Sequence, residues 1–136
     1  MNSASAYAQY QRMEVETSRE RLVLLLYNGL LRFLGQASAA MQARQYEQQG
    51  HAITRAQRIL LELRHTLNFE AGGEIARGLA AIYSYCLRRL TDANFQNDEA
   101  ALAEVIRLIS DLHGAWVAAE QAVRRSHGQA VEVAAR

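Results

Sequence analysis

The segment from Gly72 to Asp98, GGEIARGLAAIYSYCLRRLTDANFQND, restricts the fold more than any other part of the chain. Two glycines begin it, and glycine readily takes the positive φ at which a helix stops. The polar stretch 94–98 ends it. Between these ends apolar residues recur every three or four positions, the spacing of one helix face. The segment therefore predicts a bounded helix from Glu74 to Ala93. Its apolar stripe is Ile75, Leu79, Ile82, Tyr83, Cys86 and Leu90.

Composition extends the helical prediction to the whole chain. The 136 residues suffice for one domain, half of them are hydrophobic, and there is no proline. Residues such as Ala, Leu, Gln and Arg lose little side-chain freedom in a helix, so an all-α protein is expected. The formal net charge of +1 favours neither nucleic acid nor a membrane surface as a partner. The single cysteine rules out an internal disulfide and suits a reducing compartment.

Three further helices are predicted, over residues 18–44, over residues 46–68, and from residue 97 or 98 to a fading end after Val123. Thr17 and Glu20 form a capping-box pattern, with Thr17 as the N-cap of the first. Long helices with short connections predict an antiparallel up-down-up-down four-helix bundle. The bundle would span residues 17–127, between a mobile N-terminal cap segment, 1–16, and a flexible C-terminal tail, 128–136. The stripes on these helices are Val23, Leu26, Tyr27, Leu30, Phe33, Leu34 and Ala37; Ile53, Ala56, Ile59, Leu60, Leu63 and Leu67; and Leu102, Val105, Ile109, Leu112 and Trp116.

The chain holds more apolar residues than one stripe per helix requires. Residues 22–26 are consecutive and apolar, so they point all around the first helix. Exposed single leucines are ordinary, but a large bare groove would invite aggregation. The N-terminal segment could cover such a groove, with Tyr7 and Tyr10 as a lid that a partner helix displaces. The surplus residues are Leu22, Leu24, Leu25, Leu31, Leu61, Tyr85, Leu87 and Leu108.

Catalytic and metal-binding patterns are weak. Glu62 and His65 match a Glu-x-x-His element, but a di-iron bundle needs two such elements and two more inward carboxylates. We therefore expect no metal, no cofactor and no catalytic residues. Cys86 is expected to be a small buried hydrophobe. Asn94 is expected either to end a helix in the left-handed conformation or to bond a partner's backbone.

Short motifs in a fixed order give the chain a family resemblance. They include AYAQY at 6–10, Val15 with Thr17, LLYNG at 25–29, AQRILLEL at 56–63 and GGEIA at 72–76. LAAIYSYCLRRL at 79–90, AN at 93–94, ND at 97–98, Glu104 with Val105, and Trp116 complete the series. In this order and spacing the chain resembles the FliS family, the flagellin-specific export chaperones of bacteria. It departs from the family in lacking a proline before the first long helix.

The resemblance implies a cytoplasmic chaperone that binds the disordered C-terminal segment of flagellin and prevents premature polymerisation. It also implies delivery to the flagellar type III export gate and a possible co-chaperone or antagonist on the same surface. Such a protein is not an enzyme. Its N-terminal tyrosines would cover part of the binding surface or contact the gate. The residues expected to bind partners are Tyr7, Tyr10, Leu22, Leu25, Leu61, Ile75, Leu79, Tyr83, Leu87, Asn94 and Leu108.

Two other functions are compatible with the same residues. The spare apolar surface could be a self-association interface, so a monomer or a weak homodimer is expected. A metal-dependent helical enzyme is the other, less favoured, reading. The longest apolar stretch, 22–34, is interrupted by Asn28 and Arg32 and is too short to span a bilayer. With no secretory signal pattern at the N-terminus, a cytosolic protein without membrane insertion is expected.

Overall fold

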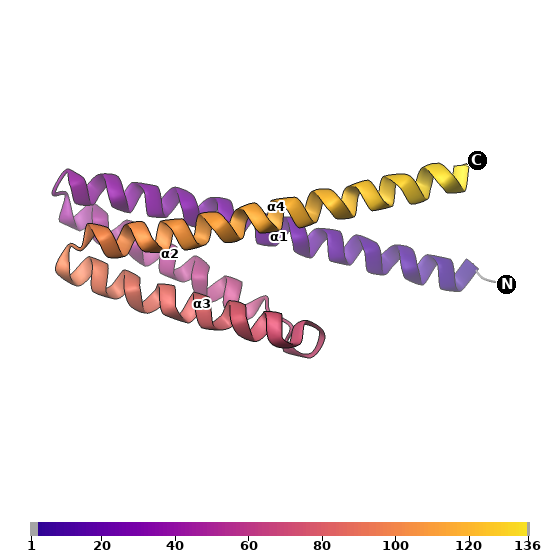
Figure 1. The fold of residues 1–136 in the computed structure, drawn as a ribbon, viewed down its shortest axis with the longest axis horizontal. Coiled ribbons are helices and arrows are strands. Elements are labelled where there is room, and N and C mark those ends of the chain that lie inside the picture. The colour runs from indigo at the N-terminus through magenta and orange to yellow at the C-terminus, as the bar shows by residue number, and fades with distance from the viewer. Residues whose placement is uncertain (1–2, 136) are drawn as a thin grey trace.

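The computed structural model describes residues 3–135, apart from the side chains of residues 3, 13–17 and 131. This part of the chain forms four helices, α1 (Ser3–Gln42), α2 (Tyr46–His65), α3 (Phe69–Gln96) and α4 (Glu99–Ala135) (Figure 1). It contains no strand, which confirms the all-α prediction.

Helix α1 begins much earlier than predicted. Residues 4–17 contain neither glycine nor proline, and half of them are Ala, Gln or Glu, so nothing there stops a helix. The backbone of Thr17 is helical, and the predicted helix start at this residue is therefore wrong. The Thr17 and Val15 side chains lie outside the described part. Helix α4 likewise continues through residues predicted as a tail. The division into a cap segment, a central domain and a tail stays a prediction.

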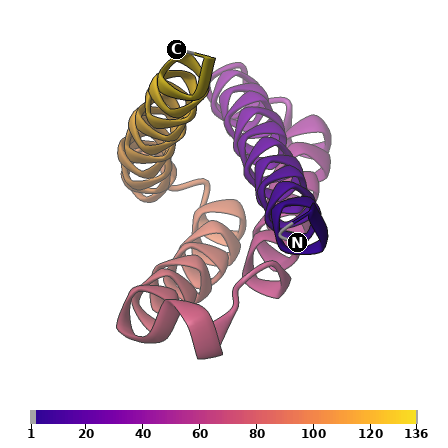
Figure 2. The ribbon, with the colours of Figure 1, turned by 90° about the vertical axis from the view of Figure 1, so that its right-hand side faces the viewer.

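The four helices contact one another in a closed cycle. Helix α1 packs against α2 and α4, and α3 packs against the same two helices. The view along the molecule shows α1 beside α2 and α4 beside α3 (Figure 2). The connections α1–α2 and α3–α4 lie at one end, and the α2–α3 turn lies toward the other (Figure 1). Beyond that turn α1 and α4 continue as two diverging arms.

The core follows the predicted stripes closely. Tyr27, Leu30, Leu60, Leu90 and other apolar side chains from all four helices are fully buried together. Ile75 is the exception, because 76% of its surface is exposed while its neighbour Ala76 occupies the buried position. The predicted stripe was drawn for one unbroken helix. The break in α3 two residues before Ile75 changes which residue faces the core. A core built from one stripe per helix is what hydrophobic burial favours.

The break is at Gly73, whose φ of 50° and ψ of −121° lie in a region open almost only to glycine. The sequence predicted a turn over Phe69–Gly73, but residues 69–72 instead form the first helical turn of α3. Asn68 starts this turn because its side-chain oxygen accepts a hydrogen bond of 3.1 Å from the Ala71 N–H. Gly72 and Gly73 are therefore a joint inside α3. The turn that connects α2 to α3 comes before them.

The opposite end is closed by polar side chains. Asn97 ends α3 in the left-handed conformation, with φ 52°, and Asp98 caps α4 by accepting from the Ala101 N–H at 3.1 Å. Asn94, predicted as the left-handed residue, is inside α3, so that interpretation is wrong. Its side-chain oxygen accepts from the buried Gln49 amide at 3.0 Å, and Asn97 accepts from the same amide at 2.9 Å. This network ties the start of α2 to the end of α3.

Residues Ser18–Gln42 of α1 pass a length and hydropathy test for a membrane span. The core helix of a soluble protein passes the same test. Tyr27, Leu30 and Leu34 in this segment are fully buried against other helices, while Arg32 is exposed. The buried side of the segment is thus explained by its place in the core, whereas Leu22 and Leu25 on the same segment are exposed.

The role of Gly73 as a joint can be tested by comparing its substitution with that of a glycine in regular helix. Gly73→Ala forces a side chain into a conformation that only glycine takes easily, and we expect a loss of about 1–3 kcal/mol in unfolding free energy. Gly78→Ala is the matched control. It lies in the same helix with open space around its Cα, so it should stabilise by about 0.5–1 kcal/mol. Urea denaturation measures both, and two variants of equal stability would contradict the joint.

Candidate functional site

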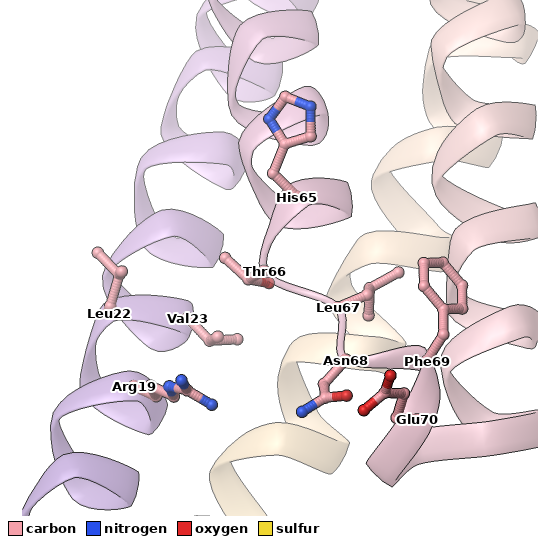
Figure 3. A pocket seen from close by; sticks show the side chains of 9 residues that line it. All are labelled: Arg19, Leu22, Val23, His65, Thr66, Leu67, Asn68, Phe69 and Glu70. Carbon is pink, nitrogen blue, oxygen red and sulfur yellow. The ribbon is translucent and has the colours of Figure 1, made fainter.

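The candidate site is an apolar groove around the α2–α3 turn, named here the turn groove. Two adjoining cavities form it, of about 560 and 420 Å³. Both are lined by Arg19 and Val23 from α1 and by the turn residues 66–68 (Figure 3). The first cavity adds Leu22, His65, Phe69 and Glu70, and the second adds Glu20, Ala71, Gly72, Ile75, Ala76, Leu79, Tyr83 and Trp116.

The turn groove brings together four of the residues predicted to bind a partner. Leu22 lines the first cavity, and Ile75, Leu79 and Tyr83 line the second. Leu22 and Ile75 are well exposed, whereas Leu79 is partly buried against the core. Tyr83 is 1% exposed, so it belongs to the floor of the groove and to the core rather than to an open surface.

An aromatic cluster forms this floor. The hydroxyls of Tyr27 and Tyr83 share a hydrogen bond of 2.6 Å, and the Trp116 indole N–H donates to the Tyr27 hydroxyl at 3.2 Å. Burial raises the pKa of both tyrosines above the ordinary value, chiefly through loss of hydration of the charged form. The floor is thus uncharged and internally hydrogen-bonded, and it offers an apolar surface to a side chain entering the groove.

The rim of the turn groove carries charges of both signs. Arg19 lines both cavities, while Glu70 lines the first and Glu20 the second, so no single charge dominates. Figure 3 shows Leu67 and Phe69 next to each other at the α2–α3 turn, with Leu22 and Val23 across from them on α1. Recognition at this site would depend on apolar shape with a few polar contacts at the edge, which is the common composition of a binding groove.

The other predicted residues lie apart from the turn groove. Leu25 and Leu61 are exposed on α1 and α2. Leu87 and Leu108 are partly buried against the core, and Asn94 is engaged by Gln49. Their roles in binding a partner stay predictions.

Tyr7 and Tyr10 do not form a lid in this structure. Both lie on the N-terminal arm of α1, with 64% and 63% of their surface exposed. The arm continues the helix away from the core instead of folding back over the groove (Figure 1). The prediction that the N-terminal segment covers the apolar surface is therefore wrong for this structure. The helical propensity of residues 4–17 keeps the segment straight.

Phe69 is the groove residue that sequence reasoning missed. It is half exposed and lines the first cavity. It had been assigned only to the turn. The available signal was a large apolar residue directly after Asn68, where a solvated turn would hold a polar one.

Polar contacts elsewhere look structural. Glu104 on α4 accepts hydrogen bonds from the Tyr85 hydroxyl at 2.7 Å and the Arg89 guanidinium at 2.8 Å, both on α3. These two bonds hold the pKa of the Glu104 carboxyl below its usual value. Within the described residues no group of three or more His, Cys, Asp or Glu side chains could hold a metal ion.

Cys86 is fully buried in the core, and burial raises the pKa of its thiol to about 11. An unfolded thiol ionises near pH 8.5. Above that pH the unfolded chain loses the proton before the folded chain does, so stability should fall as pH rises toward 11.

We therefore expect the free energy of unfolding to decline between pH 8.5 and pH 10, below the range of the tyrosines. Cys86→Ala lacks the thiol and should show a shallower decline, although it starts less stable because of the cavity. Denaturant titrations at several pH values measure the two slopes. Equal slopes would show that the thiol is not the group responsible.

The fold and groove define an all-α protein with an exposed apolar groove, and known proteins are similar to it in sequence. The family model described as flagellar protein FliS matches residues 3–123. The flagellar secretion chaperone FliS of Bacillus subtilis is 38% identical over 124 residues, covering 90% of this chain and 92% of that protein. FliSB of Pseudomonas aeruginosa is 36% identical, covering 85% and 96%, and FliS of Escherichia coli is 36% identical, covering 82% and 84%.

The chain belongs to the FliS family. The relatives are flagellar secretion chaperones, so the predicted resemblance is confirmed, as is the expectation that the chain is not an enzyme.

Proposed function

We propose that this protein is a cytosolic export chaperone for flagellin. It binds the disordered C-terminal segment of flagellin, prevents premature polymerisation and assists delivery to the flagellar type III export apparatus. Membership of a flagellar secretion chaperone family supports this role. The observation that carries the binding step is the turn groove, an open apolar surface on a well-packed helical core.

The proposed mechanism is capture by folding of the client. An amphipathic client segment would place apolar side chains, spaced at helical intervals, between Leu22 on one side and Phe69 and Ile75 on the other. Ordering a disordered segment costs about 2–5 kcal/mol or more of the interaction energy. Burial of exposed apolar area can offset this cost at about 25 cal/mol per Å². A client segment that occupies the groove is then hidden from other flagellin molecules.

The architecture that fits this mechanism is an up-down-up-down four-helix bundle. The cyclic contacts of the helices support it, because the backbone of each helix closely approaches only its two neighbours in the cycle. The client then binds outside a core that stays closed. Tyr7 and Tyr10, held on an exposed arm, are available to the client or to the export gate.

Titration calorimetry with a flagellin C-terminal peptide of about forty residues tests the proposal. We expect one-to-one binding with a large negative heat-capacity change. Ile75→Ser removes an exposed apolar anchor and should weaken binding by about tenfold or more, the worth of one aliphatic side chain. Val133→Ser, of similar exposure on the C-terminal arm, is the matched control and should bind like the parent.

If the protein is folded but does not bind the peptide, the flagellin proposal is wrong. Sedimentation then separates the remaining readings, because a tight dimer would identify the apolar surface as a self-association interface. Equal weakening by Ile75→Ser and Val133→Ser would remove the turn groove as the binding site.

The tyrosines of the arm are tested together. Because both are exposed, replacing Tyr7 and Tyr10 by Ala should leave the melting temperature unchanged while lowering flagellin affinity or export. Thermal melting and an export assay in cells measure the two effects. A variant that melts well below the parent would show that the tyrosines are structural.

A further inference from the structure

A second groove lies between α1 and α2 near the α1–α2 connection, at the end opposite the turn groove (Figure 1). We name it the hairpin groove, and its cavity volume is about 650 Å³. Four of its lining residues are alanines, so side chains hardly fill it. It is lined by Gln36, Ala39, Ala40, Ala43, Gln45, Gln48, His51, Ala52 and Arg55.

The alanines let another helix approach closely. The distance between packed helices is set by the side chains at their contact, and it is shortest where these are small. Ala39 and Ala40 lie in the last turn of α1, Ala43 directly follows that helix, and Ala52 lines the groove from α2. A ridge of a third helix can therefore rest along this floor, with the glutamines available for hydrogen bonds at its edges.

A cationic cluster around Phe33 adjoins the groove through Arg55, which is one of the groove's lining residues. The guanidinium carbon of Arg32 lies 5.1 Å from the centre of the Phe33 ring, and that of Arg55 lies 5.9 Å from it. Both arginines are exposed, and neither forms an ion pair within residues 3–135 as the structure describes them. Contact with the ring restrains the guanidinium groups while leaving their N–H edges free to bind carboxylates.

Charge is unevenly divided between the two helix pairs. Residues 18–65, which form the core part of α1 and all of α2, hold seven arginines and three glutamates. Residues 69–135, which form α3 and α4, hold six arginines and nine acidic residues. An acidic partner is therefore attracted to the α1–α2 side and repelled from the other.

We propose that the hairpin groove docks an acidic helix of a second protein. The helix would lie over the alanine floor and place carboxylates on Arg32 and Arg55. This inference goes beyond the proposed function, because it concerns a partner other than the client. The two grooves lie at opposite ends of the helical core, so the acidic helix can bind while the turn groove is occupied (Figure 1). A nucleic acid is less favoured, since two arginines and a net charge of +1 give no long basic track.

The test uses a synthetic amphipathic helix of Glu, Ala and Leu with glutamates four residues apart on one face, labelled for fluorescence anisotropy. The full chain should bind it, and binding should weaken as salt is added. Arg32→Gln with Arg55→Gln should weaken binding about tenfold, through loss of two charge-assisted contacts. Arg107→Gln with Arg125→Gln is the control, since it removes the same net charge from exposed sites on α4. NMR shift changes at residues 36–55 should locate the peptide.

Each other outcome overturns the proposal. If the acidic helix does not bind the folded parent protein, the proposal is wrong. Equal weakening by the two double variants would mean unspecific attraction. Shift changes confined to the turn groove would place the peptide at the client site. Tighter binding of a single-stranded RNA of equal charge, lost in the Arg32 and Arg55 variant alone, would assign the groove to nucleic acid.

Discussion

A hydrogen bond between two buried tyrosines holds the centre of this molecule together. Tyr27 on α1 and Tyr83 on α3 belong to helices that face each other across the core and share no close backbone contact. Their hydroxyls meet at 2.6 Å, and Trp116 on α4 donates to the same oxygen. Three of the four helices are thereby fixed relative to one another. The bond also satisfies polar atoms that would be costly to bury alone. Tyr83 and Trp116 of this cluster line the second cavity of the turn groove.

The sequence predicted the core well and the helix ends poorly, for one physical reason. Burial repeats along a helix, so the stripes identified Leu30, Leu60 and Leu90 correctly. A helix end depends on a few local bonds that compete with continued propensity. Thr17 had the residue type of a cap, but nothing before it stopped the helix. Asn94 and Asn97 both suit the left-handed conformation, and only their contacts with Gln49 distinguish them.

The candidate site was partly visible in the sequence. Leu22 was identified as a surplus apolar residue, and Ile75 and Leu79 as stripe residues expected to bind a partner. The structure gathers all three around the α2–α3 turn. Phe69 was missed because its segment was assigned to a simple turn. The hairpin groove left no apolar signal, since alanine counts equally toward core and surface. Its arginines became informative only when the fold placed them on one phenylalanine ring.

The joint at Gly73 has a consequence for the shape of the turn groove. The short helical turn before it, Phe69–Gly72, and the helix after it, which carries Ile75 and Leu79, both line the groove. A single residue with glycine's conformational freedom connects these two segments. The angle between them is therefore set at one backbone position, which lies outside the buried stripe that begins at Ala76.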